Sequence, residues 1–392
     1  MIAIVGASLA GLTVARTLRS LGVLEPITFV GAEPWLPYDR PPLSKEMLTG
    51  SDASAAPDPG WATLLTPGEA DGFDWRLGVA ATGLSSTPDG PVVHTETGDV
   101  GARAVVLATG ARARRLPGDD LSGVHTLRTL DDARGLAQDL RGAQDVVVVG
   151  AGFIGAEIAS TAVAMGRRVT IVERAPDPGV ATLGSRLARW TLDLHRRAGV
   201  DVMVGTDVDG FDSADGRVQA VRLIGGHTIP ADVVVVGVGA TAETRWAVDS
   251  PVDVDGGFVT DASGATTMPG VWAAGDCART VDPSTGTAPI HQHWSAAIES
   301  ARTVAHAIAG HAPPAARTPY VWSEQHGRRI QICGTMPRDV DPTVVEGSID
   351  DDAFVAVAGD PDSPDAVVAV DMPRPFTRLR KAMDRRVGAV RA

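Results

Sequence analysis

Two glycine-rich turns, 144 residues apart, constrain this chain more than any other feature of its sequence. The first is Gly6-Ala-Ser8-Leu-Ala10-Gly11, directly after the apolar segment Ile2–Val5. The second is Gly150-Ala-Gly152-Phe153-Ile154-Gly155, directly after Val146–Val149. Such a strand–turn–helix lets a pyrophosphate approach the backbone at the N-terminus of the helix. One motif of this kind is a weak signal, whereas two predict a chain with two dinucleotide sites.

Each turn is followed by an acidic residue at the end of the next apolar strand. Glu33 follows Ile27–Val30, and Glu173 closes Val169–Val172. A carboxylate there accepts a hydrogen bond from a ribose hydroxyl and repels a 2′-phosphate, so Glu173 predicts NADH rather than NADPH. Two dinucleotides in one chain typically place a flavin against a nicotinamide. The expected cofactors are therefore FAD and NADH.

Composition excludes several other classes of protein. A net charge of −13 argues against binding to nucleic acid or to an anionic membrane. No apolar run is long enough to cross a bilayer, and Ile2–Val5 leaves no room for a signal peptide. Cys277 and Cys333 cannot build a disulfide framework. We expect a cytoplasmic protein, monomeric or weakly dimeric, with no metal site.

At 392 residues, the chain is long enough for two or three domains. We predict an α/β fold with two Rossmann-like three-layer domains, one inserted in the other, and a small C-terminal α+β domain. The FAD-binding domain is expected over 1–109 and 240–312, the NAD-binding domain over 110–239, and the C-terminal domain over 313–392. A Ser/Ala/Pro/Asp-rich surface loop is expected over 51–60.

Within these domains the patterns predict helices over 185–198 and 295–309, and a basic helix at the C-terminal end. Short strands are expected at Tyr320–Trp322, Ile330–Cys333, Val344–Val345, Phe354–Ala358 and Val367–Val370.

A proline-rich segment, Pro37-Tyr38-Asp39-Arg40-Pro41-Pro42-Leu43-Ser44-Lys45, follows the first ribose acid. Its prolines rigidify a loop that can be neither a helix interior nor a central strand. Arg40 and Lys45 are thereby held in a rigid cationic loop, which is well placed to meet the flavin end of a bound FAD.

These motifs together resemble the FAD-dependent, NADH-linked ferredoxin reductases of oxygenase systems, of the rubredoxin, putidaredoxin and biphenyl-dioxygenase reductase type. The resemblance covers essentially the whole chain. Besides the two glycine-rich turns, its markers are Tyr38-x-Arg40-Pro-Pro-Leu-Ser-Lys45, Ala108-Thr109-Gly110, Glu157, Gly237-Val238-Gly239, Gly275-Asp276 and Pro319-Tyr-x-Trp322-Ser-x-Gln325.

The resemblance implies that Lys45 and Glu157 form the catalytic ion pair beside the reactive edge of the flavin. Either group buried alone would be costly, while a hydrogen-bonded pair is tolerable and orients both. It also implies that Asp276 bonds the ribityl chain of the flavin. The residues expected to bind cofactors are Gly6, Ser8, Ala10, Gly11, Glu33, Arg40, Lys45, Ala108, Thr109, Gly110, Gly150, Gly152, Phe153, Ile154, Gly155, Glu173, Gly237, Val238, Gly239, Gly275, Asp276, His293, Trp294 and Trp322.

The activity implied is transfer of a hydride from nicotinamide C4 to flavin N5, followed by two single electrons to a [2Fe–2S] ferredoxin that serves a P450 or a Rieske-type oxygenase. The ferredoxin is expected to dock near Trp322, Arg302 and Arg380. From Arg374 to Ala392 seven basic residues stand against one aspartate, which suits an acidic partner.

The chain departs from the family pattern at Ile290, Gln292, Ala296 and Ser300, and Ser8 replaces a fingerprint glycine. Disulfide reductases and NADH oxidases are excluded, because they need cysteines where this chain has none. A monodehydroascorbate-type reductase, which shares the Arg-Pro-x-Leu-Ser-Lys loop, remains an alternative. So does a non-catalytic flavoprotein interaction module.

Overall fold

The computed structural model describes residues 1–50, 60–282, 286–288 and 291–390. The loop expected over 51–60 lies outside the described residues except for Gly60, and so does Ile290. The chain forms two compact units, which are described in turn. The first comprises Met1–Asp39, Asp58–Arg112 and Thr241–Arg317, and the second comprises Arg40–Pro57, Ala113–Ala240 and Thr318–Ala392. Strands β8 (Ala111–Ala113) and β17 (Ala240–Ala242) lie where the chain passes from one unit to the other.

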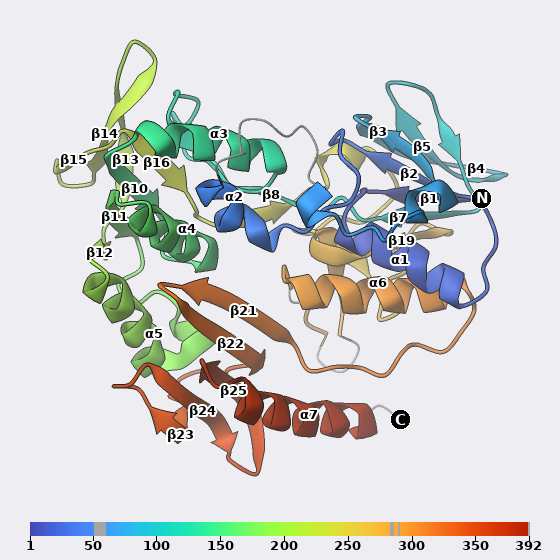
Figure 1. Cartoon of the computed structure of the whole chain (residues 1–392). Helices are drawn as coiled ribbons and strands as arrows, with labels where there is room; N and C mark the ends of the chain where they lie inside the picture. The colour runs from blue at the N-terminus through green and yellow to red at the C-terminus, as the bar shows by residue number, and fades with distance from the viewer. Residues whose placement is uncertain (51–59, 283–285, 289–290, 391–392) are drawn as a thin grey trace. The chain divides into compact units, whose positions relative to one another are not determined.

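The first unit is built on a parallel five-stranded sheet. In sheet order its strands are β19 (Val271–Ala273), β7 (Ala104–Leu107), β1 (Ile2–Val5), β2 (Ile27–Gly31) and β3 (Asp74–Leu77). Strands β1, β2 and β7 are buried along their whole length, as expected for a parallel sheet covered on both faces. Helices α1 (Leu9–Ser20) and α6 (Trp294–Ile308) pack side by side on one face (Figure 1).

The other face of this sheet packs against a small antiparallel sheet. Its strands are β4 (Ala81–Thr87), β5 (Gly90–Thr95) and β6 (Val100–Gly101). Leu84 and Val93 share a core with Val5 and Leu107 of the parallel sheet. The same unit contains the parallel pair β18 (Phe258–Thr260) and β20 (Ala278–Thr280). The first dinucleotide unit is therefore a three-layer structure.

The second unit repeats this plan. Its parallel sheet has the order β12 (Asp201–Val204), β11 (Arg168–Glu173), β10 (Asp145–Val149), β16 (Val233–Val236) and β9 (Val124–His125). Helices α3 (Leu130–Gly142) and α4 (Phe153–Ala164) cover one face. The antiparallel strands β13 (Val208–Ala214), β14 (Arg217–Leu223) and β15 (Thr228–Pro230) cover the other.

The proline-rich loop belongs to the second unit from Arg40 onward. It forms a short 3-10 helix, η1 (Pro41–Ser44), and one turn of α-helix, α2 (Glu46–Thr49). Leu48 joins the apolar core beneath α3 and α4, which anchors the loop. Lys45 is the residue between the two short helices.

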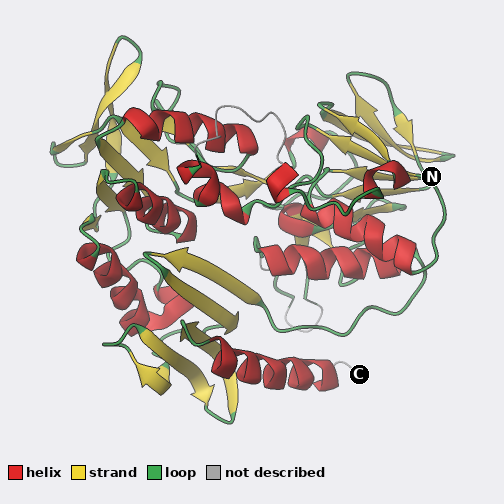
Figure 2. Cartoon of the chain, in the orientation of Figure 1, coloured by secondary structure: helices red, strands yellow, loops and turns green. Residues whose placement is uncertain are grey.

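The C-terminal part of the second unit is an antiparallel sheet flanked by helices. The sheet order is β21 (Tyr320–Gln325), β22 (Arg328–Gly334), β25 (Ser363–Val370), β24 (Ala353–Asp360) and β23 (Thr343–Ser348). Helix α7 (Pro373–Val390) covers one face through Phe376 and Met383 (Figure 2). Helix α5 (Val180–Arg197) packs on the other face through Leu187 and Trp190.

The predicted fold class is confirmed, with two parallel-sheet units and a small antiparallel C-terminal sheet. The compact units do not follow the predicted domain bounds, because the loop from Arg40 and the C-terminal sheet both group with the second parallel sheet. The three-domain division stays a prediction. Among the described residues, no helix is both long and apolar enough to span a membrane.

Candidate active site

The first glycine-rich turn is held by close backbone packing. Gly6 has φ +121°, a backbone region that disfavours side chains, and a Cβ on it would lie 2.0 Å from the carbonyl oxygen of Ala108. A Cβ on Gly11 would lie 2.3 Å from the carbonyl oxygen of Gly6. Both glycines are therefore required for α1 to begin so close to β1 and to the residue that follows β7.

The N-terminus of α1 suits a phosphate group. Ser8 is its N-cap in an extended conformation, and the Ser8 side chain makes no capping hydrogen bond. The first N–H groups of a helix have no partner within the helix, so they can donate to an anion. Beyond β2, the Glu33 carboxylate accepts a 2.5 Å hydrogen bond from the Tyr38 hydroxyl, which holds Glu33 in place.

The second turn is packed in the same way at its first and last glycines, but has free space at its middle glycine. A Cβ on Gly150 would lie 2.4 Å from the carbonyl oxygen of Gly237, and one on Gly155 would lie 2.2 Å from that of Gly150. A Cβ added to Gly152, in contrast, would have no described atom within 4 Å of it. Tight packing beneath the turn with free space at its middle glycine is what a dinucleotide pyrophosphate requires.

Glu173, the last residue of β11, lies at this second turn. Its carboxylate accepts hydrogen bonds from the backbone N–H groups of Ala151, at 2.8 Å, and Ala175, at 2.7 Å. Phe153 and Ile154 open α4, and Ile154 is exposed. Val238 packs with the core of this unit, and Gly239 accepts a backbone hydrogen bond from Arg114.

A polar cluster around Glu157 is the most constrained chemical group in the second unit. Glu157 lies on α4 and is 5% exposed. Oε2 accepts hydrogen bonds from Lys45 Nζ at 2.7 Å and from Ser44 Oγ at 2.6 Å. Oε1 accepts from Ser323 Oγ at 2.8 Å and from the Glu324 N–H at 3.2 Å. Four donors thus fix both oxygens of one buried carboxylate.

The structure contains the ion pair between Lys45 and Glu157, while its catalytic role and its place beside a flavin stay predictions. The sequence reasoning missed the roles of Ser44 and Ser323 as further donors to Glu157. Both serines lie inside quoted motifs, next to Lys45 and Trp322 respectively. A polar side chain inside such a motif was a signal that could have pointed to them.

In the first unit, Gly275 and Asp276 form a 3-10 turn after β19. Gly275 donates its N–H to Ser300 Oγ at 2.9 Å, and a Cβ on it would lie 2.8 Å from the Ala10 Cβ. Burial lowers the pKa of His293, the N-cap of α6, and the charge of His291 lowers it further, while the Asp276 carboxylate opposes the change.

Three further predicted residues belong to the first unit: Trp294, Thr109 and Gly110. Trp294 opens α6 and donates from Nε1 to Asp39 at 2.9 Å. Thr109 Oγ1 donates to the carbonyl oxygen of Glu243 at 2.6 Å, and Gly110 accepts from the Glu243 N–H.

The remaining predicted residues, Arg40 and Trp322, belong to the second unit. Arg40 donates to the carbonyl oxygen of Arg128. Trp322 stacks on Tyr320, with ring centres 5.7 Å apart. The residues expected to bind FAD are thus divided between the two units, each of which presents its own part of the set.

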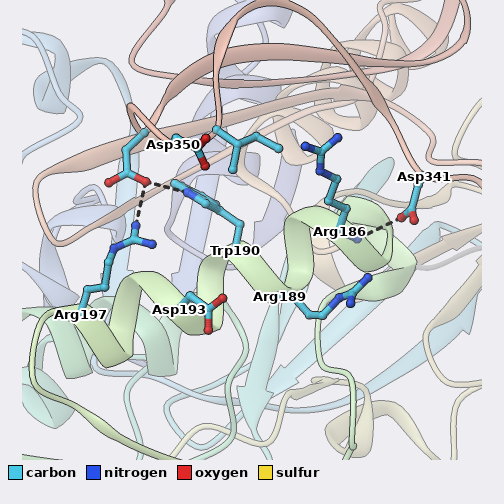
Figure 3. Close-up of a pocket in the computed structure, with 9 residues that line it drawn as sticks. Arg186, Arg189, Trp190, Asp193, Arg197, Asp341 and Asp350 are labelled. Carbon is cyan, nitrogen blue, oxygen red and sulfur yellow. Dashed lines mark hydrogen bonds and ion pairs between the residues drawn. The ribbon is translucent and has the colours of Figure 1, made fainter.

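The second unit also has a cavity of about 660 Å³ away from these residues (Figure 3). None of the residues expected to bind a cofactor lines it. In its wall, Asp352 accepts hydrogen bonds from Trp190 Nε1 and Arg197, both at 2.7 Å, and Asp341 accepts from the backbone N–H of Arg186. Both carboxylates accept hydrogen bonds from residues of α5 and therefore hold that helix in place. We place the candidate catalytic group at Glu157 instead.

Neither cysteine is part of the site. Burial raises the pKa of the Cys277 thiol and raises that of Cys333 to about 12, which leaves both thiols protonated and poorly nucleophilic. In the part of the chain that the structure describes, no group of three or more His, Cys, Asp or Glu side chains could hold a metal ion.

A buried histidine beside the cluster makes stability depend on pH. Burial, followed by the charge of His326, lowers the pKa of His195 from 6.5 to about 4. Between these values the unfolded chain binds a proton that the folded chain refuses, so acidification destabilises the fold, by about 3 kcal/mol once pH 4 is reached. The free energy of unfolding, measured by denaturant titration between pH 7 and 4, is expected to fall less steeply in His195→Gln. Equal slopes for the two proteins would contradict this account.

Comparison with known proteins assigns the family. Residues 1–301 match the family described as pyridine nucleotide-disulphide oxidoreductase, and residues 320–392 match the reductase C-terminal domain. The chain is 37% identical over 388 residues to the ferredoxin reductase component of chlorobenzene dioxygenase from Cupriavidus sp. (strain PS12), covering 98% of this chain and 92% of that protein. It is 35% identical to rhodocoxin reductase from Rhodococcus erythropolis, covering 90% of this chain and 82% of that protein.

A solved structure of a relative has the same fold as this chain. The reductase in the crystal structure of the covalent putidaredoxin reductase–putidaredoxin complex superimposes with a TM-score of 0.89 at 30% identity, covering 99% of this chain and 95% of that chain. The chain therefore belongs to the pyridine nucleotide-disulphide oxidoreductase family, as an FAD- and NAD(H)-dependent oxidoreductase with a reductase-type C-terminal domain.

Proposed function

We propose that this protein passes electrons from NADH, through FAD, to a [2Fe–2S] ferredoxin that serves a P450 or a Rieske-type oxygenase. The observation that carries the proposal is the ion pair between Lys45 of the proline-rich loop and the buried Glu157. Glu157 lies on α4, the helix that begins at the second dinucleotide turn. The relatives named as ferredoxin reductase components of dioxygenase systems, and the reductase in the putidaredoxin complex, support the choice of acceptor.

The residues present fit both cofactors. The N-terminus of α1 with Glu33 suits the pyrophosphate and ribose of FAD, and the N-terminus of α4 with Gly152 and Glu173 suits those of NADH. When bound, the flavin supplies the conversion of a two-electron hydride donor into a one-electron donor. The protein holds the two rings, sets the charge around them and receives the partner.

Glu157 and Lys45 are proposed to act at the junction of nicotinamide and flavin. Four donors keep the Glu157 carboxylate in one orientation, so it needs no reorganisation when a substrate ring arrives. Lys45 also donates to the carbonyl oxygen of Pro41 at 3.1 Å, which ties its ammonium group to the rigid loop. The pair thus offers a positive charge near a ring system that gains negative charge on reduction.

The acceptor is proposed to dock by charge. Arg380 lies 4.1 Å from the centre of the Tyr320 ring, which in turn stacks on Trp322. An aromatic pair capped by an exposed helix rich in arginine suits an acidic ferredoxin. Arg302, the third residue of the expected docking site, lies in the first unit, where it pairs with Glu299 at 3.1 Å.

Stopped-flow mixing with NADH tests the function. We expect the flavin of the purified holoprotein to bleach within seconds, and a [2Fe–2S] ferredoxin encoded beside the gene to be reduced at a rate that supports turnover. Fast bleaching with no ferredoxin reduction but rapid reduction of monodehydroascorbate would favour the alternative reductase. Slow bleaching would favour a non-catalytic flavoprotein.

Replacing Glu173 with alanine is expected to raise kcat/KM for NADPH relative to NADH by about tenfold, because repulsion of the 2′-phosphate is removed. Arg168 cannot offset that repulsion in the wild type, since it forms two 2.6 Å hydrogen bonds with Asp145. Steady-state kinetics with both nucleotides measures the change. Glu173→Gln is the matched control, because it removes the charge but keeps a hydrogen-bond acceptor. A wild-type protein that uses NADPH as well as NADH would refute the role of Glu173.

We further propose the division into an FAD-binding domain (1–109 and 240–312), an NAD-binding domain (110–239) and a C-terminal domain (313–392). A cytoplasmic location accords with two free, buried cysteines. A monomer or weak homodimer is our expectation for the oligomeric state, which analytical ultracentrifugation measures.

A further inference from the structure

A buried polar seam continues from Glu157 into the C-terminal sheet. Ser323 Oγ, which donates to Glu157, accepts a 3.1 Å hydrogen bond from Gln325 Nε2 on the same strand, β21. Beyond Gln325, His195 of α5 and His326 share a 2.8 Å hydrogen bond between Nδ1 and Nε2. Ser323, Gln325 and His195 are 1%, 2% and 3% exposed. Hydrogen bonds thus join α4 to two buried residues of β21, and the buried His195 of α5 bonds to the half-buried residue that follows Gln325.

Burying these polar side chains costs free energy, which suggests that they have a function. A buried amide needs partners for both its donor and its acceptor, and an apolar side chain would fill the same space at lower cost. Gln325 Oε1 is buried and, among the described residues, accepts no hydrogen bond of good geometry. On the His195 side, Gln325 raises the pKa of that histidine, against the lowering by burial and by His326. The amide is thus oriented with its nitrogen towards Ser323.

The orientation of this amide decides where the Ser323 proton goes. A serine hydroxyl has one hydrogen to donate and two lone pairs that accept. Because Gln325 Nε2 donates to Ser323 Oγ, it occupies a lone pair and leaves the hydroxyl hydrogen for Glu157 Oε1. With the amide reversed, Gln325 Oε1 would face the hydroxyl and would compete with Glu157 for that hydrogen.

We propose that Gln325 is a positioning residue for Glu157: it commits the Ser323 hydroxyl hydrogen to the carboxylate. Gln325 reaches Glu157 only through Ser323, so its effect requires the serine. The inference rests on the proposed function, because that function gives Glu157 its place at the nicotinamide. It extends the site from the loop and α4 to a second residue of the C-terminal sheet.

A double-mutant cycle tests the proposal on the FAD-loaded protein. Gln325→Met, Ser323→Ala and the double variant are compared with the wild type for the dissociation constant of NAD⁺, by absorbance titration, and for the rate of flavin reduction by NADH. Each single variant is expected to weaken NAD⁺ binding about fivefold. The double variant is expected to match Ser323→Ala within about twofold, because Gln325 then has no hydroxyl to direct.

Gln331→Met is the matched control. Gln331 lies on the adjacent strand β22 and donates to the Tyr320 hydroxyl. The variant therefore loses the same kind of amide group, but one that forms no hydrogen bond leading to Glu157. If Gln325→Met lowers the thermal midpoint, Gln325→Asn serves as the second variant, since its shorter amide cannot reach both Ser323 and the histidine. Nitrogen-15 NMR of the imidazoles supplies a readout independent of turnover: the pKa of His195 is expected to drop further in Gln325→Met.

Effects of Ser323→Ala and Gln325→Met that multiply in the double variant would overturn the proposal, as would an unchanged NAD⁺ affinity in both Gln325 variants. An unchanged His195 pKa in Gln325→Met would also count against the proposed orientation of the amide. None of these measurements uses a ferredoxin. A protein that binds NAD⁺ but reduces no ferredoxin would therefore refute the proposed function. The role of Gln325 would still be decided by the NAD⁺ affinities of the variants.

Discussion

Replacing Lys45 with methionine is expected to slow reduction of the bound flavin by NADH at least about tenfold, while FAD stays bound. A tenfold change in rate corresponds to ~1.4 kcal/mol of activation free energy. The variant removes the cation proposed to lie at the flavin edge. It leaves the Glu157 carboxylate buried, with 6% of its side chain exposed and no ion-pair partner. Breaking a buried pair from one side is costly because the remaining charge is not compensated.

The matched control is Arg196→Met. Arg196 pairs with Asp193 on the exposed face of α5, and the Asp193 side chain is 57% exposed. Loss of Arg196 therefore leaves a carboxylate in water, and we expect no change in flavin reduction. The double variant Lys45→Met/Glu157→Gln removes the stranded charge and is expected to recover thermal stability but not the rate.

Stopped-flow absorbance at the flavin band measures the rate, and bound FAD is quantified from the same spectrum. An unchanged rate in Lys45→Met would count against any role of Lys45 at the flavin. A rate that recovers fully in the double variant would show that the carboxylate, rather than the lost cation, caused the defect.

The features that the sequence predicts well are those encoded by neighbouring residues. The turns at Gly6 and Gly150 follow from local spacing, because a Cβ on Gly11 or on Gly155 would strike the carbonyl oxygen of the glycine five residues earlier. The strands β1, β7, β10 and β16 follow from short apolar runs that only a sheet covered on both faces can bury.

The helix expected over 185–198 is present. Element α5 (Val180–Arg197) is interrupted at Gly184, whose φ of +75° and ψ of 166° are not helical, so its longer part begins at Ser185 as predicted. The short helical segment before Gly184 was not predicted. A Cβ on Gly184 would lie 2.6 Å from Pro342, so a contact with a distant loop determines this break. The C-terminal strands are longer than predicted. Strands β24 and β25 each have eight residues, because each includes polar residues at one end that the apolar pattern did not cover.

Contacts between distant residues explain the rest of the site. Ser44 and Glu157 are separated by 113 residues, and Ser323 and Glu157 by 166. The Lys45–Glu157 pair was predicted only through resemblance to a family. Ser323, Gln325 and His195 reach their positions through the packing of β21 and α5 in one unit, and nothing in local spacing encodes that arrangement.

Replacing Arg380 with glutamate is expected to lower the rate of ferredoxin reduction about tenfold at low ionic strength, with no change in turnover from NADH to ferricyanide. The substitution reverses a charge at the proposed docking surface, and charge complementarity acts chiefly on the rate of encounter. Arg380 also loses its contact with the Tyr320 ring. Arg380→Met separates these effects, since it removes the cation without adding a repulsive charge.

The prediction depends on where the charge is reversed and not on the change in the net charge of the protein. Arg189→Glu on α5 changes the net charge by the same amount at an exposed position outside the docking surface, and is expected to leave the ferredoxin rate nearly unaltered. The Arg380→Glu defect should shrink as salt is raised, because exposed charges are screened within about 8 Å at physiological ionic strength. A defect that persists at high salt, or that lowers ferricyanide turnover in parallel, would place the damage at the flavin site and would exclude Arg380 from docking.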